Sequence, residues 1–149
     1  MRLQSTEASC GPTAMANALS ALGIKRDLEE CETLCRCDAA TGTSTQQLTR
    51  ALKTIPNLMV NRIYEKKPSS ALWHLNACLS LGRPVILCVD SSGHWVSAVG
   101  QLGVGTLTAR YVVADSGDME LVLTYDFKDL LTRWGDKGDK KTTYLGISL

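Results

Sequence analysis

The chain has 149 residues, of which 44% are hydrophobic and 21% are charged, proportions typical of one globular domain spanning residues 1–149. The net charge is only +1, from 16 basic and 15 acidic residues, which argues against a surface dedicated to nucleic acid or to anionic membranes. No hydrophobic run approaches the roughly 20 residues of a membrane helix, so we expect no membrane insertion.

The first half of the chain carries the periodic patterns of amphipathic helices. A helix is predicted over residues 10–22, with Ser9 as its N-cap, Pro12 in its first turn and Gly23 after its end. The run Ser44-Thr-Gln-Gln47 predicts a capping box that opens a helix through Lys53. The other elements expected in this half are a short helix over 27–34, a strand over 58–63 and a helix over 70–81.

Short hydrophobic runs dominate the second half and predict strands. The strands are expected over residues 85–89, 94–99, 107–114, 121–124 and 143–149, with one helix over 125–134. A glycine-rich connection over 102–105 suggests that strands 94–99 and 107–114 are antiparallel neighbours. Helices followed by mostly antiparallel strands predict an α+β fold, in which a helical half packs on a sheet.

Two residues near the start of the chain have types that suit acyl transfer at a thiol. Cys10 begins the first predicted helix, and Gln4 lies six residues before it. A thiol attacks as the thiolate, and a helix N-terminus lowers its pKa. A glutamine side chain can donate a hydrogen bond to the oxyanion that forms on an attacked carbonyl group.

His94 and Asp115 are the candidates for the remaining two roles. Histidine can take the thiol proton and later protonate a leaving group near neutral pH. His94 begins a predicted strand, whereas His74 lies inside a predicted helix and is interpreted as structural. Asp115 ends a strand that would lie beside the start of the His94 strand, where a carboxylate can orient the imidazole. Asp118 is the competing carboxylate and is interpreted as a turn residue.

With these residues in this order, the chain resembles the papain-like cysteine peptidases of family C39. That family includes the peptidase domains of bacteriocin-exporting ABC transporters and their stand-alone relatives. The resemblance covers nearly the whole chain and rests on Gln-x5-Cys-Gly, Gly-His-Trp-Val-Ser-Ala-Val-Gly and Val-Ala-Asp-Ser. It implies a papain-like fold in which Cys10 is the nucleophile, His94 the base, Asp115 its orienting partner and Gln4 an oxyanion donor.

The resemblance further implies a cysteine peptidase that cuts a peptide or protein substrate. Transporter-attached relatives cut leader peptides after a Gly-Gly or Gly-Ala pair. Ser116 follows Asp115 where many relatives carry proline, and coupling to transport would need a separate transporter or partner protein. Two alternatives stay open: a thiol enzyme that acts on another amide (a deamidase, transglutaminase or amidase), and a non-catalytic module that binds peptides.

The other five cysteines are interpreted as structural. Cys31, Cys35 and Cys37 lie close in sequence, but a zinc site would need a fourth ligand, so a metal or redox role is the weaker interpretation. Cys78 and Cys88 lie in hydrophobic runs and are predicted core residues. The N-terminus has no signal-peptide pattern, and six cysteines without one suggest reduced thiols and a cytoplasmic protein. No metal or cofactor is expected.

Overall fold

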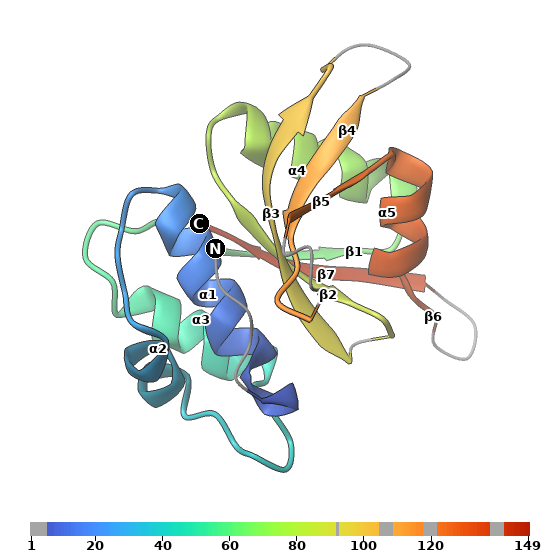
Figure 1. Ribbon diagram of the computed structural model, residues 1–149. Helices are drawn as coiled ribbons and strands as arrows, with labels where there is room; N and C mark the ends of the chain where they lie inside the picture. The colour runs from blue at the N-terminus through green and yellow to red at the C-terminus, as the bar shows by residue number, and fades with distance from the viewer. Residues whose placement is uncertain (1–5, 92, 105–108, 118–121, 138–141) are drawn as a thin grey trace.

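The computed structural model describes residues 6–91, 93–104, 109–117, 122–137 and 142–149. These residues form five α-helices, one 3-10 helix and seven strands (Figure 1). In chain order they are η1 (Glu7–Ser9), α1 (Cys10–Ala21), α2 (Leu28–Cys35), α3 (Thr45–Lys53), β1 (Asn61–Glu65), α4 (Pro68–Ser80), β2 (Val85–Val89), β3 (His94–Leu102), β4 (Arg110–Ala114), β5 (Val122–Tyr125), α5 (Phe127–Trp134), β6 (Asp136–Lys137) and β7 (Thr142–Ser148).

The strands form one sheet in the order β1-β7-β2-β3-β4-β5, and β6 pairs with β7. Every pairing within it is antiparallel. Helices α1, α2 and α3 lie together on one side of the sheet (Figure 1). The predicted α+β class, with a helical half packed on a mostly antiparallel sheet, is confirmed.

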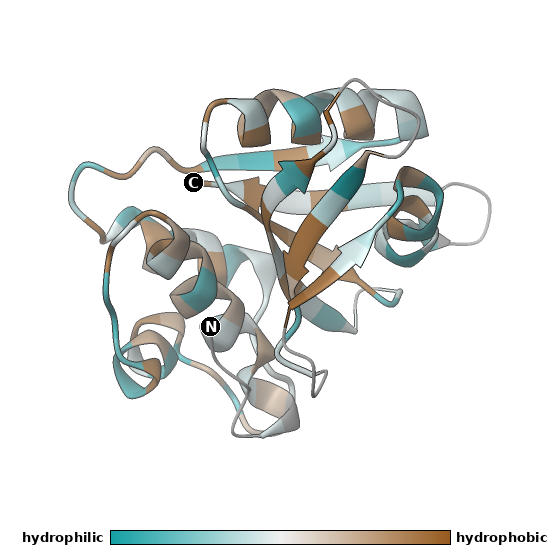
Figure 2. Cartoon of the chain, turned by 45° about the horizontal axis from the view of Figure 1, so that its top comes forward, coloured by the Kyte–Doolittle hydropathy of each residue, from teal (hydrophilic) through white to brown (hydrophobic). Residues whose placement is uncertain are grey.

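Strand β2 shows how the sheet supports two separate cores. All five of its residues are buried, and successive side chains in a strand point to opposite faces. Ile86 and Cys88 join the core formed with α1, α2 and α3, whereas Val85, Leu87 and Val89 join the core beneath α4 and α5. The hydrophobic stretches of the central strands therefore lie between two layers of helix (Figure 2).

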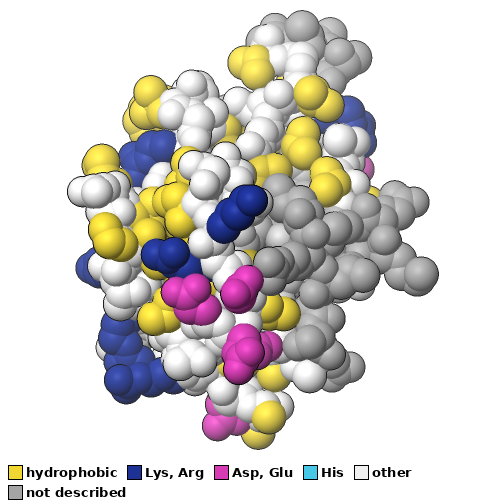
Figure 3. Space-filling view, turned by 60° about the vertical axis from the view of Figure 1, so that its left-hand side comes forward, with side chains coloured by type: hydrophobic (Ala, Val, Ile, Leu, Met, Phe, Trp, Pro, Cys, Tyr) yellow, Lys and Arg dark blue, Asp and Glu magenta, His cyan; other side chains and the backbone are white. Residues whose placement is uncertain are grey.

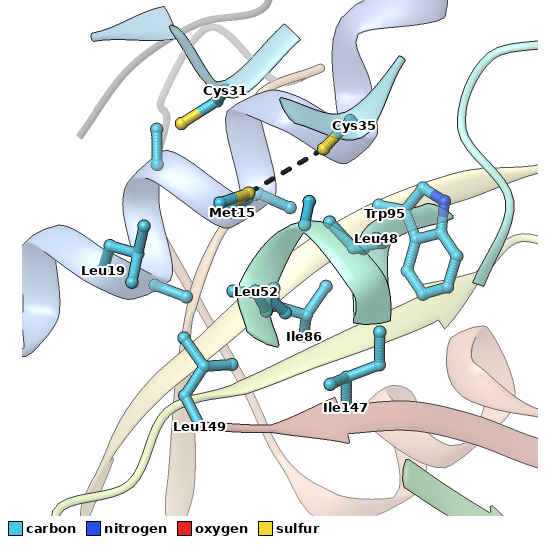
Figure 4. Packing of buried hydrophobic residues seen from close by; sticks show 14 of the residues in the cluster. Met15, Leu19, Cys31, Cys35, Leu48, Leu52, Ile86, Trp95, Ile147 and Leu149 are labelled. Atoms are coloured by element: carbon cyan, nitrogen blue, oxygen red, sulfur yellow. Dashed lines mark hydrogen bonds between the residues drawn. The ribbon is translucent and has the colours of Figure 1, made fainter. Parts of the chain in front are cut away.

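The first core holds α1 against the sheet. Met15 and Leu19 of α1 are fully buried and pack with α3 and with Ile86 of β2 (Figure 4). A buried hydrogen bond of 2.7 Å from Ser97 Oγ of β3 to the Ala14 carbonyl oxygen of α1 joins the two elements directly. The N-terminus of α1 is thereby fixed against β3.

Several predicted local features are confirmed. Ser44 and Gln47 form the expected capping box at the start of α3. Gly23 follows α1 with a φ of +77°, a conformation that glycine adopts without strain. Helices α1, α2 and α4 and strand β2 lie within two residues of their predicted bounds.

Other local predictions need correction. Ser9 stands at the N-cap position of α1 but makes no side-chain cap, and its hydroxyl group donates to Glu32 of α2 over 2.9 Å. The strand predicted over 58–63 lies at 61–65, where it can pair with β7. Tyr125 belongs to β5 rather than to the following helix, and the short strand β6 was not predicted. Residues 107 and 108 of the predicted strand 107–114, and residue 121 of the predicted strand 121–124, lie outside the described residues.

The mixed charges on the surface and the properties of the described helices agree with the small net charge and the short hydrophobic runs of the sequence. Figure 3 shows Lys and Arg side chains together with Asp and Glu side chains, interspersed with hydrophobic ones, on one face of the molecule. None of the described helices combines the length and the hydrophobicity needed to span a bilayer.

Candidate active site

Cys10 is the first residue of α1, and only 6% of its surface is exposed. Burial raises the pKa of its thiol, but hydrogen bonding to His94, the backbone N–H groups of Trp95 and Gly11, and the positive charge of His94 together lower it below the ordinary value. The first turn of a helix also favours a negative charge. The site therefore favours the thiolate form of Cys10.

Sheet pairing brings His94 and Asp115 together. His94 begins β3, and β4 runs antiparallel beside it, with Ser97 opposite Ala114. Asp115 follows Ala114 and so lies toward the start of β3. The Nε2 atom of His94 is 2.7 Å from Oδ1 of Asp115, the adjacency predicted from the glycine-rich connection.

This contact leaves the other ring nitrogen, Nδ1, as the atom of His94 available to Cys10. Burial lowers the pKa of His94, but its hydrogen bonds with Asp115 and Cys10 and their negative charges raise it overall to about 9. The imidazole is therefore protonated at neutral pH. The lowered pKa of Cys10 and the raised pKa of His94 both favour a thiolate–imidazolium pair, the form in which a cysteine is most reactive.

Asp115 is held from three sides, and only 3% of its side chain is exposed. Its Oδ1 atom accepts hydrogen bonds from His94 and from the Gly117 N–H group, the latter over 3.0 Å. Its Oδ2 atom accepts one from Nη1 of Arg133. Burial raises the pKa of Asp115, but these three hydrogen bonds and the charge of Arg133 hold it well below its usual range. The carboxylate is ionised beside the imidazolium.

A pocket of about 290 Å³ opens beside Cys10. The loop over residues 39–43 forms one wall, and Ala8, Gly93 and Trp95 complete the lining. Asp38 and Gly42 close this loop by a pair of backbone hydrogen bonds, and the Trp95 indole N–H donates to the Thr43 carbonyl oxygen over 2.9 Å. Among the described residues that line it, none other than Cys10 carries a charge, so this part of the pocket suits a small, uncharged portion of a ligand.

Two of the other residues singled out in the sequence are not described by the structure, and a third lies away from the site. Gln4 and Asp118 lie outside the described residues. His74 lies in α4, partly exposed, 3.4 Å from Glu65 Oε1 and apart from the site, as its structural interpretation predicted. Trp95 both packs in the first core and lines the pocket.

The cysteine cluster has the character of packed thiols. Cys31 and Cys35 are fully buried in the first core, and the Cys35 thiol lies 3.8 Å from the sulfur of Met15 (Figure 4). Burial, with the neighbouring Cys31 and Cys37, raises the pKa of Cys35 to about 12, so it stays a thiol, a poor metal ligand. Among the described residues, no three His, Cys, Asp or Glu side chains are grouped as metal ligands. Cys78 and Cys88 are core residues.

Two contributors to the site were missed by sequence reasoning. Arg133 was assigned only to a predicted helix, although its guanidinium group holds Asp115. Gly117 lies so close to the pair that a Cβ atom there would stand 3.3 Å from the His94 ring and 3.4 Å from Asp115. The sequence Asp-Ser-Gly after a strand could have indicated the Gly117 contact, but no local pattern indicates the Arg133 contact.

Comparisons with known proteins identify the family and agree with the fold. The model of the Peptidase_C39 like family matches residues 1–142. The peptidase domain of Streptococcus ComA, a bifunctional ABC transporter involved in quorum sensing, superposes with a TM-score of 0.69 at 16% identity, over 98% of this chain and 93% of that one. A double-glycine motif protease from an AMS/PCAT transporter, solved in complex with the leader peptide, superposes with a TM-score of 0.66 at 15% identity, over 97% of this chain and 86% of that one. The Streptococcus mutans ComA peptidase domain superposes with a TM-score of 0.61 at 15% identity, over 99% of this chain and 95% of that one. No curated protein sequence matches the chain.

Proposed function

This chain belongs to the Peptidase_C39 like family, and we propose that it is a cysteine peptidase that cleaves a peptide bond in a peptide or protein substrate. The observation that carries the proposal is the position of His94. Its ring is hydrogen-bonded to Asp115 on one side, and it makes a hydrogen bond and a favourable charge interaction with Cys10 on the other. In the proposal, residues 1–149 form a single C39-like domain that works in the cytoplasm.

In the first half of the proposed reaction, the Cys10 thiolate attacks the carbonyl carbon and forms a C–S bond. The electron pair of the carbonyl double bond moves to the oxygen, and the Cys10 backbone N–H and the Gln4 side chain stabilise this oxyanion. The oxyanion then collapses, the C–N bond breaks, and the His94 imidazolium gives its proton to the leaving amine. A thioester on Cys10 and a neutral His94 remain.

Water completes the turnover. Neutral His94 takes a proton from the water molecule that attacks the thioester, and the C–S bond breaks to release the carboxylic acid product and the Cys10 thiolate. Asp115 keeps the imidazole in one orientation and stabilises its protonated form throughout. This cycle restores the thiolate–imidazolium pair.

The substrate class that fits best is a leader peptide with a Gly-Gly or Gly-Ala cleavage site, and a separate transporter is the partner we propose. The described residues that line the pocket beside Cys10 are small apart from Trp95, and none of them but the proposed nucleophile carries a charge. One similar solved structure is a double-glycine motif protease in complex with its leader peptide. Both observations support a substrate with small residues at the cut.

The test is cleavage of a peptide library enriched in Gly-Gly and Gly-Ala sites, read by mass spectrometry. Cys10→Ala should abolish cleavage, whereas Cys37→Ser, which changes a partly exposed thiol, should leave it. Gln4→Ala should cost about 10²–10³-fold if Gln4 donates to the oxyanion. A deamidated or cross-linked product with an intact backbone would refute peptide cleavage, and an undiminished rate in Gln4→Ala would remove Gln4 from the mechanism.

Iodoacetamide provides a second test that needs no substrate. Near neutral pH it should modify Cys10 before the other five thiols, because the lowered pKa of Cys10 increases its thiolate fraction. Equal labelling of all six cysteines would refute the activated thiol.

A further inference from the structure

Arg133 of α5 makes polar contacts with three different side chains around the site. Its Nε and Nη2 atoms donate to the two carboxylate oxygens of Asp90 over 2.9 and 2.8 Å. Its Nη1 atom donates to Asp115 Oδ2 and, over 2.9 Å, to the Tyr125 hydroxyl group. Only 22% of its side chain is exposed. All three guanidinium nitrogens therefore have fixed partners.

The two carboxylates that Arg133 joins directly follow β2 and β4, the strands on either side of β3, which begins with His94. Asp90 directly follows β2 and opens the turn into His94, with a φ of +54°. Its backbone N–H also donates to the Arg133 carbonyl oxygen over 3.0 Å. Asp115 directly follows β4. One arginine thus ties the turn before His94 to the carboxylate that contacts His94.

We propose that Arg133 is a positioning residue, whose guanidinium fork holds Asp115 against His94 and thereby sets the thiolate fraction of Cys10. The proposal rests on the proposed function of the Cys10–His94 pair. Arg133 does not line the pocket beside Cys10, so it acts through Asp115 and not by contact with substrate.

The charges along this path alternate in sign. Five ionised groups form a row in which each one neighbours a group of opposite charge: Asp90, Arg133, Asp115, His94 and Cys10. A buried carboxylate that loses one fixed partner loses orientation as well as charge compensation. Without Arg133, Oδ2 of Asp115 has no guanidinium partner, and the Oδ1 contact with His94 is no longer fixed in direction.

Arginine and lysine differ in a way that separates positioning from charge. A guanidinium group presents several donors in one plane and can bind two carboxylates at once, whereas an ammonium group is a single point of charge. Arg133→Lys keeps the charge and removes the fork. Arg133→Met removes both and keeps much of the side-chain length.

The experiment measures the pH dependence of Cys10 alkylation by iodoacetamide in the wild type, Arg133→Met and Arg133→Lys. We expect the apparent pKa of Cys10 to rise by about one unit in both variants, so that alkylation at mildly acidic pH slows by about tenfold. With a cleavable peptide, kcat should fall and KM should stay unchanged. Arg110→Met is the matched control, because Arg110 donates to Thr124 at the far end of β4, and it should keep the wild-type profile.

Each outcome decides the inference. A wild-type profile in Arg133→Met overturns it, and a wild-type profile in Arg133→Lys alone shows a charge effect and overturns positioning. If Arg133→Met fails to fold, Asp90→Asn takes its place. This substitution weakens the contact of Arg133 with the exposed Asp90 carboxylate. It should shift the pH profile of Cys10 alkylation in the same direction, but by less. A wild type that alkylates selectively but cuts no peptide would refute the peptidase proposal and leave this inference standing.

Discussion

Gly11, next to the candidate nucleophile, packs tightly against Thr43, and Gly11→Ala tests the importance of this contact. A Cβ atom at position 11 would stand 2.7 Å from Thr43 Cβ, 3.0 Å from its Oγ1 and 3.2 Å from its Cγ2. Thr43 cannot retreat easily, because its carbonyl oxygen accepts from the Trp95 indole N–H and the next residue, Ser44, caps α3. The new methyl group therefore meets a fixed neighbour.

Two opposing terms set the magnitude. Replacing glycine by alanine within a helix stabilises it by about 1 kcal/mol. Overpacking costs about 1–3 kcal/mol, and we take the upper end because the nearest atom is a Cβ held by the backbone. A Cβ before Pro12 further disfavours the helical conformation at position 11. We expect Gly11→Ala to lower the free energy of unfolding by about 2 kcal/mol, the difference between these terms.

The assay is urea denaturation followed by tryptophan fluorescence, with Cys10 alkylation measured in parallel. Alkylation should slow, because the Gly11 N–H group that stabilises the thiolate moves with the backbone. Gly100→Ala is the control, since a Cβ there meets nothing within 4 Å, and its stability should change by less than about 0.5 kcal/mol. Thr43→Gly removes all three contacting atoms and should recover most of the loss in the double variant. A Gly11→Ala protein as stable as the wild type would refute the reasoning.

Three further outcomes are expected. Thr43→Val should raise the free energy of unfolding by about 1 kcal/mol in the same urea assay, because the Thr43 hydroxyl is buried without a hydrogen-bond partner in the described part of the chain; a loss of stability would contradict this. Peptide turnover should rise with pH through the lowered pKa of Cys10 and fall through about 9, where His94 loses the proton needed by the leaving amine; turnover that keeps rising above that pH would contradict the assignment. Leu52→Ala should cost about 2–5 kcal/mol in thermal or urea unfolding, because Leu52 is fully buried, whereas Leu81→Ala, at a residue that is 72% exposed, should cost less than about 0.5 kcal/mol; similar losses would contradict the core assignment.

The parts of the site that could be predicted from sequence are those with local signals. Cys10 follows the pattern of a helix start, and His94 and Asp115 each stand at a strand boundary. Because β3 and β4 are consecutive and joined by a short connection, their antiparallel pairing followed from the spacing alone. The contact between His94 and Asp115 is a consequence of that pairing.

The parts that could not be predicted depend on contacts between segments far apart in the chain. The N-cap expected of Ser9 does not form, and its hydroxyl group instead contacts Glu32 of α2, 23 residues later in the chain. Arg133 reads in sequence as one of several charged residues on an amphipathic helix. Only the packing of α5 beside β2 and β4 shows that it reaches Asp90 and Asp115.

The site is divided between the helical layer and the sheet, and this division orders events during synthesis. Cys10 leaves the ribosome first, whereas His94, Asp115 and Arg133 follow much later in the chain. At about 5–20 residues per second, several seconds pass during which the Cys10 thiol has neither its helix docked on β3 nor an imidazolium beside it. We expect the thiol to keep its ordinary, weakly reactive state on the nascent chain, and to gain the larger thiolate fraction of the folded site only when the second half of the chain has folded against the first.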